Sequence, residues 1–148
     1  RLVRLLGLDY GAARIGVALS DPSGRIASPH SVIRHIGWGP SARAVAQLVR
    51  ENGCAYVVLG LPCHMDDHEG AQAREVRGFA EVLRKQGLRV EFQDERLTSR
   101  EAEDALREGG VPIRQSKGLV DQVAAALILQ AWLDRASSLV PPDGDPSI

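Results

Sequence analysis

The chain has 148 residues, enough for one domain with a buried core, and its 18 basic and 19 acidic residues give a formal net charge of -1 at pH 7. This balance excludes nucleic-acid binding driven by overall charge, so any such binding must rest on a local site. Only two Trp, two Tyr and two Phe are present, which argues against the large aromatic platforms of single-strand binders.

The first third of the chain predicts three strands joined by short connections. An apolar run over 2–8 stops at Asp9, and the sequence RIGVALSD over 14–21 resumes as a second strand. The turn PSG leads into a third strand over 25–35, where Pro29 indicates an edge or a bulge. Short connections of this kind predict an antiparallel meander.

The rest of the chain alternates helices with apolar strands. Ser41 is the expected N-cap of the first helix, and the capping box Thr98…Glu101 opens the third. A meander followed by such units predicts an α/β protein with a mixed sheet and helices on its faces. The expected helices cover 41–52, 71–86, 98–110 and 119–136, and the expected strands cover 55–62 and 88–95.

Domain organisation and compartment follow from the remaining composition. We expect a single domain over 1–136 and a flexible tail over 137–148, which is rich in Pro, Gly, Ser and Asp. Cys54 and Cys63 form no C-x-x-C unit, which argues against a disulfide framework or zinc ribbon and favours a reducing, cytoplasmic setting. No apolar run approaches the roughly 20 residues of a membrane span, so we expect no membrane contact.

Three acids stand out by their positions. Asp9 and Glu95 lie at the ends of expected strands, and Asp121 lies near the start of the last helix. Ligands of open α/β sheets bind beyond the carboxyl ends of strands. Carboxylates from separate segments suit a hard cation such as Mg²⁺ or Mn²⁺. Two such ions can activate water and stabilise the leaving oxygen of a phosphodiester.

Each acid also has an ordinary structural explanation. Asp9 could simply belong to a turn, and Glu95 could pair with Arg96 or precede a helix cap. Asp121 is followed by the apolar run QVAAALILQ, where an unpaired carboxylate is costly. It therefore needs a partner, which could be a metal, an arginine or a helix N-terminus, and it is the most informative of the three.

Four sequence blocks together resemble the YqgF family, also called RuvX. In chain order they are LGLDYGAARIGVALSDPSG, VVLGLPCHMDDHEGAQAREVRGFAEVL, DERLTSREAEDAL and VDQVAAALILQAWLD, and the resemblance runs from about residue 3 to residue 135. It implies an RNase H-like fold whose five-stranded mixed sheet has the order 3-2-1-4-5, with helices on both faces. It also implies a metal-dependent nuclease that uses two Mg²⁺ or Mn²⁺ ions.

The resemblance assigns roles to the same three acids. The acid of the family's D-x-G block falls on Asp9, that of its D-E-R-x-T block on Glu95, and that of its V-D-x-x-A-A block on Asp121. Asp94 is the less favoured neighbour of Glu95. By this resemblance the three acids are catalytic metal ligands, with Asp9 contacting both ions.

Three basic residues are candidate ligands of substrate phosphate. Arg14 and Arg96 carry guanidinium groups that can fork onto a phosphate, although Arg96 could equally orient the acids. Lys117 lies in the segment RQSKGL just before Asp121, where a cation could contact phosphate or simply face solvent.

The loop after the fourth strand departs from the family, whose members have Asn and Asp-Gly where this chain has His64 and Asp66–Asp67. His64 and His68 have the i, i+4 spacing of a zinc helix, but Met65 replaces the Glu of H-E-x-x-H. A zinc site is therefore not favoured.

The leading function that the resemblance implies is processing of the 5′ end of the 16S ribosomal RNA precursor during ribosome biogenesis, with structured RNA as the partner. The alternative nuclease is a Holliday junction resolvase that acts on branched, four-way DNA, a substrate that would suit a homodimer with two-fold symmetry. A non-catalytic nucleic-acid-binding module is a third possibility. An ATP-handling domain of the actin or sugar-kinase type is a fourth, but it needs two such domains and this chain has length for one.

Overall fold

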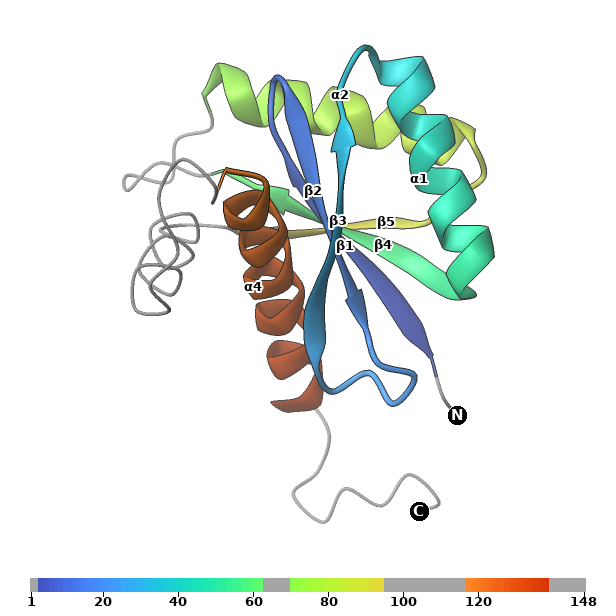
Figure 1. The fold of residues 1–148 in the computed structure, drawn as a ribbon, viewed down its shortest axis with the longest axis vertical. Helices are drawn as coiled ribbons and strands as arrows, with labels where there is room; N and C mark the ends of the chain where they lie inside the picture. Colours follow the sequence, from blue (N-terminus) through green and yellow to red (C-terminus); the bar gives the residue numbers. More distant parts are fainter. Residues whose placement is uncertain (1–2, 63–69, 95–116, 139–148) are drawn as a thin grey trace.

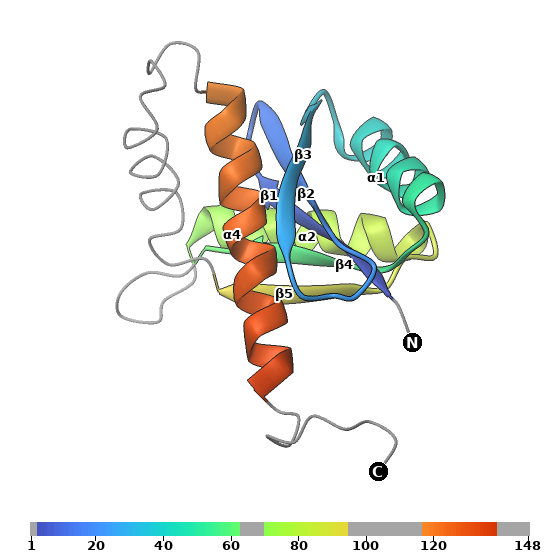
Figure 2. The ribbon, with the colours of Figure 1, turned by 60° about the horizontal axis from the view of Figure 1, so that its bottom comes forward.

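A computed structural model describes residues 3–62, 70–94 and 117–138 of the chain. Within these residues a central sheet has helices on both faces (Figures 1 and 2). The elements are β1 (Arg4–Tyr10), β2 (Arg14–Ser20), β3 (Ala27–Arg34), α1 (Trp38–Asn52), β4 (Cys54–Leu61), α2 (Ala71–Lys85), β5 (Val90–Asp94) and α4 (Lys117–Ser138).

The five strands have the order β3-β2-β1-β4-β5. The first three strands pair antiparallel, as the short connections predict, whereas β4 and β5 join β1 in parallel. Pro29 lies on the edge strand β3, next to the register shift between Val17 and Ala18 of β2. The mixed sheet and both expectations for Pro29, edge and bulge, are confirmed.

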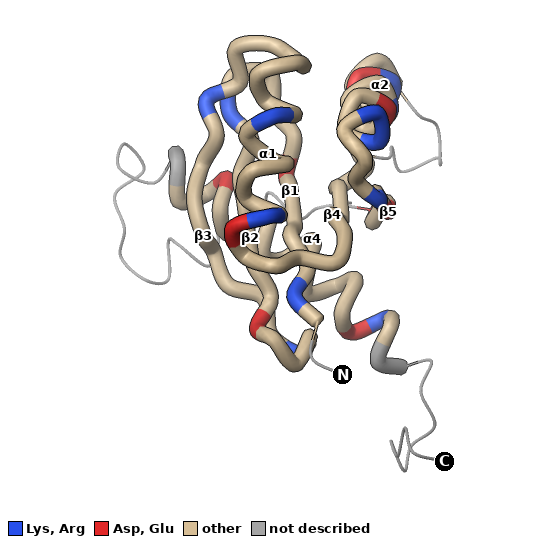
Figure 3. Tube along the Cα trace, turned by 90° about the vertical axis from the view of Figure 1, so that its right-hand side faces the viewer, with Lys and Arg blue, Asp and Glu red and all other residues tan. Residues whose placement is uncertain are grey.

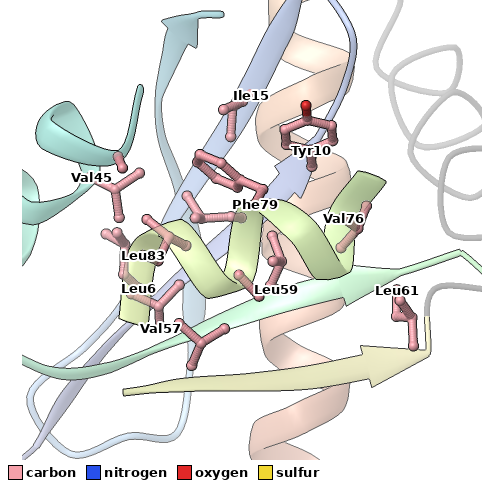
Figure 4. Close-up of a cluster of buried hydrophobic side chains, with 14 of the residues drawn as sticks. Leu6, Tyr10, Ile15, Val45, Val57, Leu59, Leu61, Val76, Phe79 and Leu83 are labelled. Carbon is pink, nitrogen blue, oxygen red and sulfur yellow. The ribbon is translucent and has the colours of Figure 1, made fainter. Parts of the chain in front are cut away.

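One face of the sheet packs against α1 and α2. Alternate residues of β1 point to this face, so Leu6 and Leu8 are fully buried there in one cluster with Phe79 of α2. Figure 4 shows Leu6 and Phe79 in this cluster. Val45 brings α1 onto the same cluster. This cluster fixes β1 at the centre of the sheet.

Among the described helices, α4 is the one that packs against the opposite face. Leu5, Ala18 and Val58 of three adjacent strands contact the α4 side chains, among them Leu129. A Cβ built at Gly7 would lie only 2.7 Å from Cβ of Leu129, so the missing side chain of Gly7 lets α4 lie close to the sheet. Figure 2 shows α4 running across this face. Within the described parts of the chain, no helix has the length and apolar character to cross a membrane.

The start of α1 corrects one expectation. The helix begins at Trp38 with Gly37 as N-cap, so Ser41 is not the cap. Pro40 is tolerated in the first turn because N–H groups there lack helical partners in any case. Ser41 lies inside the helix, where it is buried and its hydroxyl bonds to the His35 ring, 2.6 Å away.

The last helix is longer than expected, because α4 runs from Lys117 to Ser138 and not from 119 to 136. It therefore takes up the first two residues of the segment expected to be a flexible tail. The rest of that tail, over 139–148, lies outside the described residues, as does the helix expected over 98–110.

Candidate active site

Asp9 lies in the second-to-last position of the central strand β1 and pairs with Gly16 of β2. Side chains alternate along a strand, so Asp9 points to the same face as Leu5, the face that α4 covers. Its side chain is half-buried. A rigid central strand therefore presents this acid beneath α4.

Asp121 lies in the second turn of α4, directly above Gly16. A Cβ built at Gly16 would overlap the main-chain carbonyl group of Asp121 and lie 3.0 Å from Cβ of Asp121. Directly opposed residues of an antiparallel pair have Cβ atoms about 5 Å apart, which places Asp9 beside the same spot. The two acids, 112 positions apart in sequence, thus meet on one face of the sheet.

Arg14, at the start of β2, pairs with Asp121. Its Nε lies 2.5 Å from Oδ2 of Asp121, and the two side chains are 44% and 20% exposed. Asp121 therefore has an arginine partner, one of the three that its apolar neighbourhood allowed. Arg14, a candidate phosphate ligand, thus forms an ion pair with a carboxylate in this structure.

The carboxyl ends of β1, β4 and β5 lie at one edge of the sheet because the three strands are parallel. Asp94 ends β5 opposite Leu61 at this edge and is exposed. The remaining candidates lie outside the described residues, wholly or in their side chains: Glu95, Arg96, Lys117, His64 and His68.

The donor set of this site fits a hard cation. Asp9 and Asp121 supply carboxylate oxygens, the ligands that Mg²⁺ and Mn²⁺ prefer. Among the described residues, no group of three or more His, Cys, Asp and Glu side chains could hold a metal ion. The described part of the chain thus brings together two of the three expected acids, and Glu95 lies outside it.

A polar network that the sequence did not predict fixes the end of β1 on the other side of the sheet. The Tyr10 hydroxyl accepts a hydrogen bond from Nε1 of Trp38 and shares one with Nε2 of His35, both at 2.9 Å. Burial raises the pKa of Tyr10, against the lowering effect of the Trp38 bond. Tyr10 directly follows Asp9, so this network steadies the backbone that carries the acid.

Comparison with solved structures identifies the class of fold. Thermus thermophilus RuvC bound to a Holliday junction substrate superposes with a TM-score of 0.57 at 15% identity, covering 90% of this chain and 96% of that one. The fowlpox virus resolvase in complex with Holliday junction DNA gives 0.55 at 10% identity, with 90% and 99% covered. At such identities the likeness establishes the fold alone, which is the RNase H-like fold of RuvC.

Sequence comparison is more specific. The family model described as "RuvX: Holliday junction resolvase" matches residues 3–135, so the chain belongs to the RuvX family. A protein of Anaeromyxobacter sp. (strain Fw109-5) named "Putative pre-16S rRNA nuclease" is 50% identical over 133 residues, which cover 89% of this chain and 97% of the relative. A relative of the same name from Syntrophus aciditrophicus is 43% identical over 136 residues, 91% of each chain.

Proposed function

We propose that this protein is a metal-dependent nuclease that hydrolyses phosphodiester bonds at the 5′ end of the 16S ribosomal RNA precursor. The observation that carries the proposal is the meeting of Asp9 and Asp121 over Gly16 on the face covered by α4. The names of the relatives at 50% and 43% identity support the choice of substrate.

The acids and the arginine of the site have different roles in this reaction. Asp9, Asp121 and Glu95 would hold Mg²⁺ or Mn²⁺, which would supply Lewis acidity at the scissile phosphate. Arg14 orients the carboxylate of Asp121 through its Nε. The same guanidinium has further N–H groups that can donate to a phosphate oxygen.

Resolution of four-way DNA is the second candidate, because the matching family model is described as a Holliday junction resolvase. RNA and DNA differ at the 2′-hydroxyl, which a protein can read. The two substrates must therefore be compared directly, under the same conditions and with the same preparations.

The test measures cleavage of a labelled RNA spanning the precursor 5′ end and of a four-way DNA junction, each with Mg²⁺ or Mn²⁺. We expect the wild type to cut the RNA at the mature end faster than the junction. Asp9→Asn and Asp121→Asn should each lose more than about a hundredfold in rate, since even residues that only support metal ligands cost 10–100-fold.

Asp134→Asn is the matched control. Asp134 is an exposed acid on the same helix, about 20 Å from Asp121, where it accepts a hydrogen bond from Gln130. We expect this variant to cleave like the wild type. Full activity of Asp9→Asn would refute the assigned site, and preferential cutting of the junction would favour the resolvase.

A further inference from the structure

A pocket of about 320 Å³ lies at the far end of α4 from Asp121. We call it the Trp132 pocket; its wall combines Leu5 of β1, Tyr56 of β4, Trp132 and Leu133 of α4, and Arg25 of the β2–β3 connection. Its volume is at the lower end of the range of about 300–1,000 Å³ for ligand sites. The pocket therefore suits one small group and not an extended strand.

Two aromatic rings of this pocket are held in fixed positions. Nε1 of Trp132 donates a hydrogen bond of 3.0 Å to the hydroxyl of Tyr56. The ring centroids are 6.3 Å apart and the planes meet at 78°. Because the polar atoms of the two rings satisfy each other, the rings can offer apolar surface to a planar ligand without leaving a buried N–H unpaired.

One arginine lies over each of these rings. Cζ of Arg89 lies 4.1 Å from the centroid of Tyr56, and Cζ of Arg135 lies 4.6 Å from that of Trp132. Arg25 contributes to the wall of the pocket itself and forms no ion pair among the described residues. Figure 3 shows basic and acidic positions side by side in the last turns of α4.

Three acids on the neighbouring segments have hydrogen-bond or ion-pair partners of their own. Glu91 pairs with Arg89 at 3.1 Å, and Asp134 accepts a hydrogen bond from Gln130 at 3.0 Å. Asp21 accepts from the main-chain N–H of Arg25 at 2.9 Å, which uses the backbone and not the guanidinium of that residue. Arg89 is thus neutralised by Glu91, and Arg25 is the wall residue whose guanidinium can reach a phosphate beside the aromatic surface.

We propose that the Trp132 pocket binds one unpaired nucleotide of the nucleic acid on which the active site acts, an inference that rests on the proposed function. The base lies against Trp132 and Tyr56, and Arg25 contacts the adjoining phosphate. Positive charge next to aromatic rings is the chemistry by which proteins hold single strands. Trp132 is eleven residues beyond Asp121 on one helix, about 16 Å, a span of about five stacked nucleotides.

The test uses the fluorescence of Trp132. The chain has two tryptophans, so Trp38→Phe leaves Trp132 as the reporter, and Asp9→Asn with EDTA prevents cleavage. Titration with a twelve-residue oligoadenylate should give saturable quenching. Arg25→Ala should weaken the binding about tenfold, the effect of losing one hydrogen bond to a charged group. Arg43→Ala removes an exposed arginine on α1 across the sheet and should leave the binding unchanged.

Because Trp38 bonds to Tyr10 and its replacement could disturb the fold, the same Arg25 and Arg43 variants are also compared with both tryptophans intact. Here the anisotropy of a labelled oligoadenylate reports binding, and we expect the same tenfold difference. No quenching of Trp132 in a folded protein, or equal effects of the two arginine variants, would refute the proposal that this pocket binds a nucleotide. Cleavage by the wild type is read separately, so loss of the nuclease proposal and loss of the pocket give different results.

Discussion

Replacement of Gly16 by alanine tests directly whether close contact between β2 and α4 builds the site. The new Cβ would overlap the main-chain carbonyl of Asp121. Main-chain atoms inside a helix cannot rotate away as the end of a side chain can. Either α4 must lift from the sheet or β2 must bend, and in both cases Asp121 moves relative to Asp9.

The size of the effect follows from two opposing terms. Overpacking a core costs about 1–3 kcal/mol, and contact with backbone favours the upper end of that range. Losing a glycine stabilises the chain by about 0.4–1 kcal/mol through the unfolded state. The net loss is about 2 kcal/mol in the free energy of unfolding of Gly16→Ala, or roughly 4–8 °C in Tm for a chain of this size.

Calorimetry of Gly16→Ala and Gly39→Ala measures this difference. Gly39 lies in α1, and a Cβ there would only approach the flexible end of Arg43, at 3.4 Å. The Gly39 variant should match or slightly exceed the wild type in Tm. Nuclease activity of Gly16→Ala, measured where it is fully folded, should fall as well. A Tm within 1 °C of the wild type, or full activity, would refute the reasoning.

Two further predictions concern charged groups. Arg14→Gln should lose at most about 1 kcal/mol of stability, because its ion pair with Asp121 is partly exposed. Its cleavage rate should fall about tenfold or more, and Arg14→Lys should be only partly active. Wild-type kinetics of Arg14→Gln would contradict the proposed role of Arg14. The main-chain N–H of Ile26 and the Ser23 hydroxyl hold the pKa of Asp21 well below its usual range. The contribution of ionised Asp21 to the free energy of unfolding is complete above about pH 4 and is lost as the pH falls further. The Tm of Asp21→Ala should therefore lie below that of the wild type by a constant amount from pH 7 to about 5, and the difference should shrink in acid. A difference that grows in acid would contradict this.

Local patterns in the sequence were sufficient for much of the fold. Alternating and continuous apolar runs predicted all five strands, and the parallel and antiparallel pairings agree with the lengths of the connections between them. The position of Asp9 near a strand end and of Asp121 in an apolar helix predicted two acids that the structure brings together. The prediction of Ser41 as the cap of α1 is wrong: Ser41 has the chemistry of an N-cap, but it lies inside the helix and its hydroxyl bonds to His35.

Only the tertiary structure decided how the site is assembled. Arg14 and Asp121 are 107 positions apart, and no spacing rule connects residues so distant. From the sequence, Gly16 is only a residue that weakens a strand. Its role, which is to let the backbone of Asp121 in α4 come close to β2, is visible only in the tertiary structure. The sequence by itself determined which residues are able to carry the proposed chemistry, since charge and hydrogen-bonding capacity belong to the side chain. Which of them meet depends on the packing of one helix on one face of the sheet, because contact between distant segments is set by the whole core and not by local preference.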